Sequence, residues 1–327
     1  MSPLSRREAL ARVGRSALFV SATAVLGRAA WDPVGPRESR AVSGPGRRDL
    51  RVRGAEPGRI ELAIASGGPA AAATPEALTR RAIAALGGMD RFVSRGDVVA
   101  IKPNVGWDRT PAQAANTNPR VVAELVRLAL GAGAKRVVVT DIPCNEPARC
   151  FERSGIGPAA HEAGAEVVLP AEHLLRTVRL GGEVLDEWPV HRPLLEADKV
   201  IGVPVAKHHG LTRYTGALKN WYGLLGGRRD RLHQRIDESI ADLAAFLQPT
   251  LTVVDATRVL LRGGPQGGNL ADTLDARTVI ASVDQVAADA CACRLIGVVA
   301  DELPYLALAE RRGLGTRRWD RLRWAQV

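Results

Sequence analysis

Lysine and histidine residues that follow an apolar run form the part of this chain best suited to chemistry. The run leads into Lys207, His208 and His209, and Lys219 with Asn220 follows ten residues further on. The chain has 45 Lys and Arg, of which only five are Lys, so a lysine marks a position where a compact, titratable ammonium suits better than a guanidinium. An imidazole transfers protons near neutral pH. We therefore predict that His208, His209 and Lys219 are catalytic.

The positive charges of Lys102, Lys207 and Lys219 predict an anionic ligand, such as a carboxylate or a phosphate. Lys219 is expected at the start of a helix or turn, where backbone N–H groups also attract an anion. The loop GGPQGG permits a close approach of the backbone to a ligand. The expected substrate- or cofactor-binding residues are Lys102, Asn104, Lys207, Asn220, Gly264 and Gly267. Asp141 and Asp255, each at the end of an expected strand, would orient a histidine or bind a metal.

Each of these residues also has a purely structural interpretation. Lys102 would extend its ammonium past a strand end, one histidine would lie in the core and the other on the surface, and Lys219 would be exposed. Asp141 would cap the helix that follows. The loop GGPQGG lacks the Lys-Ser/Thr pair of a P-loop, so a flexible loop is its default interpretation. Polar residues at the ends of several strands are more specific than any single residue, because such ends meet at one edge of a sheet.

Apolar runs alternate with amphipathic stretches along most of the chain. The expected strands are 60–65, 98–102, 136–140, 166–169, 200–205, 251–255 and 278–283. The expected helices are 74–85, 118–130, 236–247 and 284–296, with helix-like pieces over 149–163 and a hairpin over 175–192. This alternation predicts an α/β fold with a mostly parallel or mixed central sheet covered by helices on both faces.

The N-terminal segment has the pattern of a targeting signal. Arg6 and Arg7 precede Leu10 and a short apolar run over 16–27, which is too short to span a membrane comfortably. We predict a twin-arginine-type signal over 1–30, a Pro/Gly/Arg-rich linker over 31–59, the α/β domain over 60–300 and a basic tail over 301–327. The protein would then be exported by the twin-arginine machinery, either released outside the cytoplasm or anchored to the membrane by the signal. The tail would dock on the domain or contact a membrane surface.

The net charge of +10 is concentrated at the two ends of the chain. Residues 1–59 hold 12 Arg against five acidic residues, and residues 311–327 hold six Arg against Asp320, so the segment between them is close to neutral. A basic face on the folded domain is therefore not indicated, and we expect no nucleic-acid partner.

The four cysteines do not form an iron–sulfur motif. No CxxC or CxxCxxC run is present, so we expect no intrinsic ferredoxin-type cluster. Cys144 and Cys150 are close enough in sequence to form a disulfide in an oxidising compartment. Cys291 and Cys293 fall in a helical pattern that turns them to different faces, where small buried residues are expected.

Several segments resemble the domain of unknown function 362 family over about residues 60–297. The segments are IKPNVGW, NTNPRVVAELVRLALGAGAKRVVVTD, KHHGLTRYTGALKNWYGLLGG, VVDATRVLLRGGPQGG and VDQVAADACACRLIG. The resemblance implies these motif positions: Lys102, Asn104, Asp141, Lys207, His208, Lys219, Asn220, Asp255 and Asp289. Many relatives carry a ferredoxin-like domain, whose cysteines this chain lacks, which leaves a separate redox protein as a candidate partner.

A shorter stretch, from the histidine pair through Tyr214, Gly216 and Lys219, is similar to the nickel-pincer lactate racemase family. That similarity implies proton transfer by His208 or His209 and a cofactor held by Lys219. Together these patterns predict an enzyme that acts on an anionic small molecule or cofactor, with redox chemistry or isomerisation as the reaction classes. The alternative is a non-catalytic binding protein for an anionic solute or a metal-bound cofactor.

Overall fold

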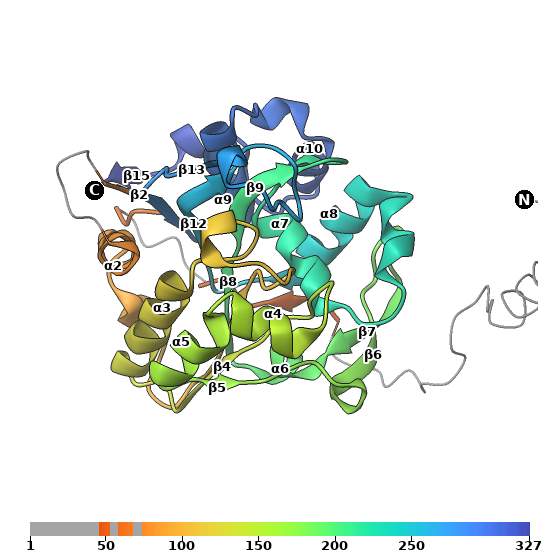
Figure 1. Ribbon diagram of the computed structural model, residues 1–327, viewed down its shortest axis with the longest axis horizontal. Coiled ribbons are helices and arrows are strands. Elements are labelled where there is room, and N and C mark those ends of the chain that lie inside the picture. The colour runs from red at the N-terminus through yellow and green to blue at the C-terminus, as the bar shows by residue number, and fades with distance from the viewer. Residues whose placement is uncertain (1–45, 53–57, 68–73) are drawn as a thin grey trace, which may run out of the picture. The chain divides into compact units, whose positions relative to one another are not determined.

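The computed structural model describes residues 46–52, 58–67 and 74–327. The expected signal over 1–30 and most of the expected linker lie outside these ranges. The central sheet runs in the order β15-β2-β14-β12-β8-β3-β4-β5, with β9 and β13 also paired to β12 and β10 paired to β9 (Figure 1). Strand pairing is parallel from β12 through β8, β3 and β4 to β5, whereas β14 is antiparallel to both its neighbours. The fold is therefore α/β with a mixed, mostly parallel sheet, which confirms the predicted fold class.

The strands of the sheet are β2 (Leu62–Ser66), β3 (Val98–Pro103), β4 (Arg136–Val139), β5 (Glu166–Val167), β8 (Lys199–Val203), β9 (Val205–His209), β10 (Arg213–Thr215), β12 (Leu251–Leu260), β13 (Thr273–Leu274), β14 (Thr278–Ser282) and β15 (Trp324–Gln326). Two separate pairs are β1 (Arg48–Asp49) with β11 (Leu247–Gln248) and β6 (Leu175–Arg179) with β7 (Glu187–His191). The helices are α2 (Pro75–Ala85), α3 (Pro119–Gly131), α4 (Pro147–Arg153), α5 (Ile156–Glu162), α6 (Arg192–Glu196), α7 (Ala217–Asn220), α8 (Ile236–Phe246), α9 (Gln285–Ala292) and α10 (Pro304–Arg311).

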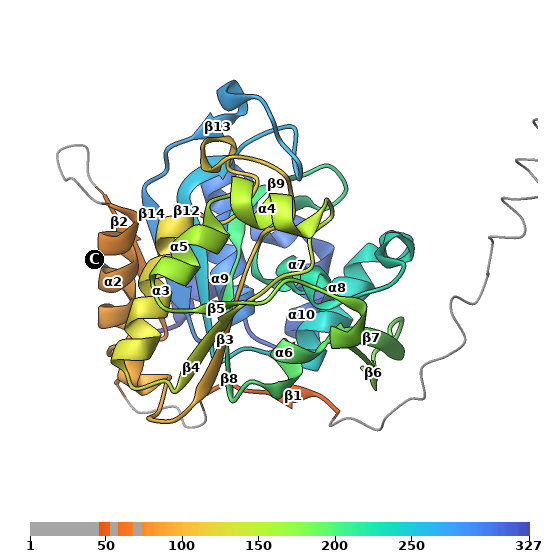
Figure 2. The same ribbon diagram turned by 60° about the horizontal axis from the view of Figure 1, so that its bottom comes forward.

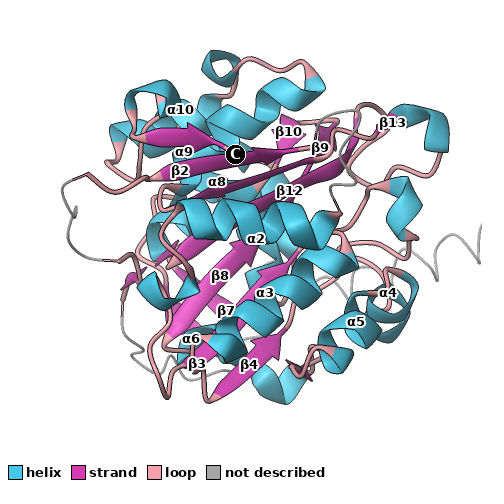
Figure 3. Ribbon diagram, turned by 90° about the vertical axis from the view of Figure 1, so that its left-hand side faces the viewer, coloured by secondary structure: helices cyan, strands magenta, loops and turns pink. Residues whose placement is uncertain are grey.

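Helices cover both faces of the sheet, because the buried strands are apolar at successive positions and side chains alternate between faces. In β3, Val99 and Ile101 join the core under α2, α3 and α5, whereas Ala100 joins the core under α7, α8, α9 and α10. Figure 2 shows the first group of helices on one side of the sheet and α8 with α10 on the other. Figure 3 looks onto α2 and α3 with the strands behind them.

Helix starts follow local capping chemistry. The Thr74 side chain accepts a hydrogen bond from the Ala77 N–H, and proline follows as the first helical residue of α2. Asn118 caps α3 in the same way, again followed by proline. Both helices begin where the sequence places them, since these caps satisfy backbone N–H groups that have no partner within the helix.

The strand expected over 200–205 differs from its prediction. Pro204 has no N–H to donate to a neighbouring strand, so β8 ends at Val203 and the chain continues as β9. β9 pairs with β10 and with the far half of β12. Lys207 and His209 therefore lie within a strand, and not in a loop beyond its end.

The C-terminal residues lie against the domain. α10 packs on α8 and α9, and β15 adds a strand in parallel to β2 at the edge of the sheet. Trp319 and Trp324 contact each other edge to face, with their ring centroids 5.3 Å apart. Among the described residues, no helix combines the length and hydrophobicity needed to cross a bilayer.

Candidate active site

A cavity of about 460 Å³ opens at the carboxyl ends of β3 and β4, beside β9 and α7. We call it the lysine pocket. Its lining residues are Lys102, Asn104, Gly106, Trp107, Asp141, Ile142, Cys144, Lys207, His209, Thr215, Lys219, Asn220, Tyr222, Gly223, Gly227, Arg229, Asp230, His233 and Pro265. Seven of the eleven predicted site residues line this cavity: three at the carboxyl ends of β3 and β4, two in β9 and two in α7.

At one end of the lysine pocket, Lys102 forms a fully buried ion pair. Its Nζ lies 2.6 Å from Oδ1 of Asp141, and it also donates to the Pro103 carbonyl and to Oδ1 of Asn220. The Asp141 carboxylate accepts further hydrogen bonds from the Val105 and Ile142 N–H groups. Burial lowers the pKa of Lys102, and the charge of Asp141 opposes that shift.

Asparagine side chains link Lys102 to the second lysine. Asn104 donates from Nδ2 to Oδ1 of Asn220 at 3.2 Å and accepts from Nζ of Lys207 at 3.0 Å. The Lys207 ammonium also donates to the Ala115 carbonyl. No carboxylate of a described residue pairs with Lys207, so burial lowers its pKa to about 7, with the charges of Lys219 and Lys102 acting in the same direction.

Lys219 has the least satisfied cation in the lysine pocket. Its side chain is 9% exposed, and its ammonium lies over the ring of Tyr222, 4.3 Å from the centroid. No hydrogen bond or ion pair to a described residue satisfies this ammonium. Burial is the largest cause that lowers its pKa to about 8, and the nearby Arg229 charge contributes. An ammonium placed this way is available to a ligand.

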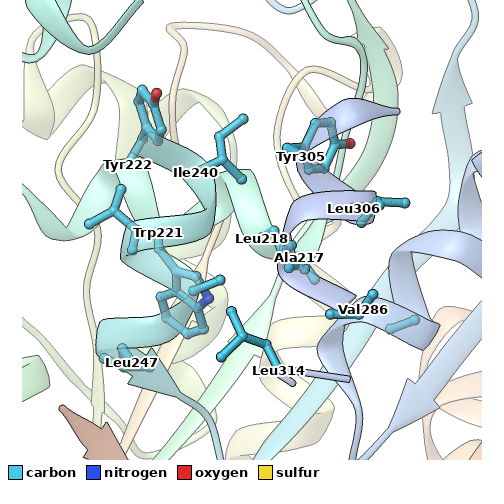
Figure 4. Packing of buried hydrophobic residues seen from close by; sticks show 14 of the residues in the cluster. Ala217, Leu218, Trp221, Tyr222, Ile240, Leu247, Val286, Tyr305, Leu306 and Leu314 are labelled. Atoms are coloured by element: carbon cyan, nitrogen blue, oxygen red, sulfur yellow. The ribbon is translucent and has the colours of Figure 1, made fainter. Parts of the chain in front are cut away.

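The short helix α7, which carries Lys219, is held in place by hydrogen bonds to α9. The buried carboxylate of Asp289, in α9, accepts hydrogen bonds from the Ala217 and Leu218 N–H groups and from the Tyr214 hydroxyl. Figure 4 shows Ala217, Leu218 and Trp221 packed against side chains of α8, α9 and α10. A short helix held by a buried carboxylate and an apolar cluster fixes where Lys219 and Asn220 enter the pocket.

His209 is held as a neutral hydrogen-bond donor. Its Nδ1 accepts from the Leu211 and Thr212 N–H groups at 3.1 and 3.3 Å, so the neutral ring has its proton on Nε2. Burial lowers the pKa of His209 to about 3, with the charges of Lys219 and Lys207 as further causes. The ring can therefore donate Nε2–H to a ligand in the lysine pocket, but it is not protonated near neutral pH.

His208 and the two glycines lie outside the pocket lining. His208 is adjacent to His209 in an extended strand, where successive side chains point to opposite faces. Its Nδ1 accepts from the Gly264 N–H at 3.2 Å, and a Cβ on Gly264 would collide with the His208 carbonyl. Gly267 approaches Leu260 and the Gln113 carbonyl. These glycines serve the packing of their loop on β9 and β12, and the loop contributes Pro265 to the pocket.

Asp255 also lies outside the pocket lining, whereas Asp141 is part of it. Its carboxylate accepts from the Asn118 N–H at 2.7 Å and from both the N–H and the hydroxyl of Thr257. It therefore fixes the start of α3 against β12. Across the part of the chain that the structure describes, no three His, Cys, Asp or Glu side chains are grouped so that they could hold a metal ion.

Several residues that line the pocket were not predicted from the sequence as site residues. Arg229 lines the cavity and donates to the carbonyls of Ile142, Pro143 and Tyr222, with no carboxylate partner among the described residues. Gly223 lies so close to Lys102 and Asp141 that a Cβ there would collide with the carboxylate. Cys144 is an exposed free thiol at the pocket, and Cys150 is a separate buried free thiol. The motif segment WYGLLGG was the only signal for Gly223.

The arrangement has more positive than negative charge. Lys102 and Asp141 neutralise each other, and Asp230 at the rim pairs with Arg228 outside the lining. Lys207, Lys219 and Arg229 remain without a carboxylate among the described residues. Buried cations without counter-ions are costly, and an anion that enters the cavity would relieve that cost.

Comparison with known proteins finds a relative in sequence and more distant similarities to solved structures. The chain is 27% identical over 238 residues to the thylakoid-associated protein sll1697 of Synechocystis sp., covering 70% of this chain and 72% of the relative. Two solved structures are more distant, each 15% identical: a protein from Thermotoga maritima (TM-score 0.42, 72% of this chain) and the lactate racemase apoprotein from Thermoanaerobacterium thermosaccharolyticum (TM-score 0.34, 68% of this chain). The chain spans 60% and 55% of their lengths.

The family described as "domain of unknown function (DUF362)" matches residues 99–294, which is more than half of the chain and includes every residue of the Lys102–Lys207–Lys219 arrangement. This protein therefore belongs to the DUF362 family.

Proposed function

We propose that this protein is an enzyme that binds an anionic small molecule, such as a carboxylate or a phosphate, in the lysine pocket. Its reaction would transfer a proton between this molecule and a side chain of the pocket. The observation that supports this proposal best is the excess of positive charge in the cavity, where Lys207 and Lys219 are buried and Arg229 is half-buried. Lys207, Lys219 and Arg229 reach one cavity without a carboxylate partner among the described residues. An anion would supply the missing counter-charge, and Nε2–H of His209 would donate to one of its oxygens.

Lysine is the proton-transfer group of this proposal, in place of the histidine pair. The pKa values of Lys207 and Lys219 are lowered to about 7 and about 8, mainly by burial. Both amines thus exchange protons near neutral pH, which is the condition for general acid–base catalysis. Lys219 is the better candidate for the base, because its amine has no hydrogen-bond acceptor among the described residues.

A non-catalytic anion-binding protein is the second candidate. The hydrogen bonds of Lys207 favour this second candidate. Its ammonium already donates to Asn104 and to the Ala115 carbonyl, so it is held in place as a binding group. In either case we propose export through a twin-arginine signal at Arg6 and Arg7. Replacement of both arginines by lysine should retain a fused reporter in the cytoplasm, and export of the double variant at the wild-type level would contradict this.

Anion binding is tested by thermal shift and calorimetric titration with small mono- and dicarboxylates and with inorganic phosphate. We expect the Lys219→Met variant to lose at least tenfold in affinity, since a partly buried charge contributes a few kcal/mol to a contact of about 4 Å. The matched control is Lys199→Met, at the opposite end of β8, where the side chain is 31% exposed. Affinity should fall as the pH rises from 7 to 9, because the two lysines lose their charge. Equal affinity in both variants would refute the lysine pocket as the binding site.

The catalytic step is tested by incubating ligands that bind with the protein in D2O and following exchange of their C–H protons by mass spectrometry. An enzyme that transfers protons through Lys219 should incorporate deuterium in the wild type and in Lys199→Met, but not in Lys219→Met. Binding without exchange for every ligand that binds would favour the second candidate.

A further inference from the structure

We propose that Cys144 is a nucleophilic thiol of the lysine pocket, directed at electrophiles that carry a negative charge. This inference rests on the proposed function, because it requires the pocket to attract anions, and it adds a reactive group that anion binding alone does not need.

The first supporting observation is the position of the thiol. Cys144 is exposed, unpaired and part of the pocket lining, together with Lys207 and Lys219. It follows β4 by five residues and so lies at the same edge of the sheet as the lysines. The other three cysteines, Cys150, Cys291 and Cys293, are buried and outside the lining.

The second observation is that the loop carrying Cys144 is fixed at several points. The Cys144 N–H donates to the Gly106 carbonyl at 2.9 Å, and the Ile142 N–H donates to the Gly223 carbonyl at 3.0 Å. Arg229 donates to the carbonyls of Ile142 and Pro143 at 2.7 and 2.6 Å. A thiol on a segment held in this way keeps one position relative to the pocket, as a reactive group must.

The third observation is the charge that faces the thiol. Arg229 contacts the loop itself, and Lys102, Lys207 and Lys219 line the same cavity from β3, β9 and α7. The carboxylates on the lining are Asp141, which is paired with Lys102, and Asp230, which is exposed at the rim. These cations would attract an anionic electrophile toward the thiol.

Lys219 supplies an independent pointer to a ligand. It is nine-tenths buried, lines the cavity, and has no hydrogen bond or ion pair among the described residues. An electrophile with a carboxylate or phosphate group would place that group against Lys219 and its reactive carbon near the thiol. The sulfur would then attack that carbon, forming an S–C bond while the leaving group departs with its electron pair and the thiol proton passes to water.

The experiment compares alkylation by iodoacetate, which is anionic, with alkylation by iodoacetamide, which is neutral and of similar size. Both rates are measured at low ionic strength by peptide mass spectrometry on the native protein, with N-acetylcysteine as the reference thiol. We expect label at Cys144 alone, and an iodoacetate-to-iodoacetamide rate ratio at least tenfold higher than for N-acetylcysteine. The ratio should fall as salt rises to 0.5 M, because salt screens the lysine charges.

Two variants assign the preference to the pocket. Lys219→Met should lower the ratio several-fold, whereas Lys199→Met should leave it at the wild-type value. A ratio equal to that of N-acetylcysteine, or label at the other cysteines in the native protein, would overturn the proposal. The anion-induced shift in melting temperature is measured in parallel on the wild type. If anions raise the melting temperature but Cys144 does not prefer iodoacetate, the role of the thiol is refuted and anion binding is not. If anions do not raise the melting temperature and Cys144 shows no preference, the anion pocket is refuted as well.

Discussion

The two ends of the lysine pocket solve the problem of a buried ammonium in different ways. At one end Lys102 is matched by the carboxylate of Asp141 and by two further acceptors. At the other end the direct contacts of Lys207 and Lys219 with described residues are neutral: a side-chain amide and a carbonyl for Lys207, and an aromatic ring for Lys219. Residues of the same type therefore have different tasks in one cavity.

A paired end and an unpaired end suggest a division between support and binding. Every polar atom of the Lys102 end has a partner within the protein, so a ligand has little to add there. The unpaired end keeps cations that have no counter-ion among the described residues, and a bound anion would supply one. Single changes at the paired end should therefore reduce stability, whereas changes at the unpaired end should reduce binding.

The largest effect is expected from Lys102→Met. This change leaves the carboxylate of Asp141 buried without its counter-ion, which costs about 3–5 kcal/mol of unfolding free energy. Urea denaturation measures it, with Lys199→Met as the surface control expected to change stability by less than about 0.5 kcal/mol. The double variant Lys102→Met/Asp141→Asn should recover part of the loss. A loss below about 1 kcal/mol in the single variant would show that the pair is not a support.

Lys207→Met should change the pH dependence of stability. The folded protein releases the Lys207 proton near pH 7, whereas the unfolded chain keeps it up to about pH 10.5. Between these values the unfolded state binds more protons, so the unfolding free energy of the wild type rises with pH, by up to about 1.4 kcal/mol per pH unit. The cost of the buried charge is thus greatest below pH 7.

The variant lacks this group, so the wild type should gain on the order of 3 kcal/mol relative to Lys207→Met between pH 7 and pH 10. Denaturation of both proteins at pH 7, 8, 9 and 10 measures the difference. Parallel curves would mean that Lys207 keeps its proton in the folded state and is compensated like Lys102.

Much of the fold follows from the sequence, because local signals agree with the final packing. The apolar runs at β3, β4 and β8 and the Thr-Pro and Asn-Pro caps of α2 and α3 require no distant contact to be recognised. The split between β8 and β9 was missed, although Pro204 signals it. The pairing of β15 with β2 joins residues about 260 positions apart, and no local pattern predicts it.

The site was predictable where it depends on strand ends. Lys102 and Asp141 come together because the parallel strands β3 and β4 bring their carboxyl ends to one edge. Lys207 lies in β9, which continues the chain beyond the end of β8. The sequence did not decide between His208 and His209, because alternation in an extended strand separates them but does not show which one faces the cavity. Cys144 lies in a loop and Arg229 begins a short 3-10 helix, and the positions of both depend on tertiary contacts that the sequence does not display.

A smaller effect on stability is expected from Gly223→Ala, at the paired end. A Cβ at Gly223 would collide with Oδ1 of Asp141 and lie 2.8 Å from Nζ of Lys102, so the ion pair must move. Overpacking of this kind costs roughly 1–3 kcal/mol. The matched control is Gly210→Ala, where a Cβ meets nothing nearer than a carbonyl at 3.9 Å. Equal stability of the two variants by urea denaturation would contradict the tight packing of the paired end.

The smallest effect, and the one specific to binding, is expected from His209→Asn. Oδ1 of asparagine can take the place of Nδ1 and accept from the Leu211 and Thr212 N–H groups, so the fold should change by less than about 1 kcal/mol. What is lost is Nε2–H, and anion affinity should fall by about two- to tenfold, the worth of one hydrogen bond. His208→Asn is the control outside the lining and should leave affinity unchanged. Because the pKa of His209 is lowered to about 3, wild-type affinity should show no step near pH 6.5 from this residue. A step in affinity near pH 6.5 that is seen in the wild type but not in His209→Asn would contradict this. It would mean that the His209 ring becomes positively charged in the pocket, like Lys207 and Lys219.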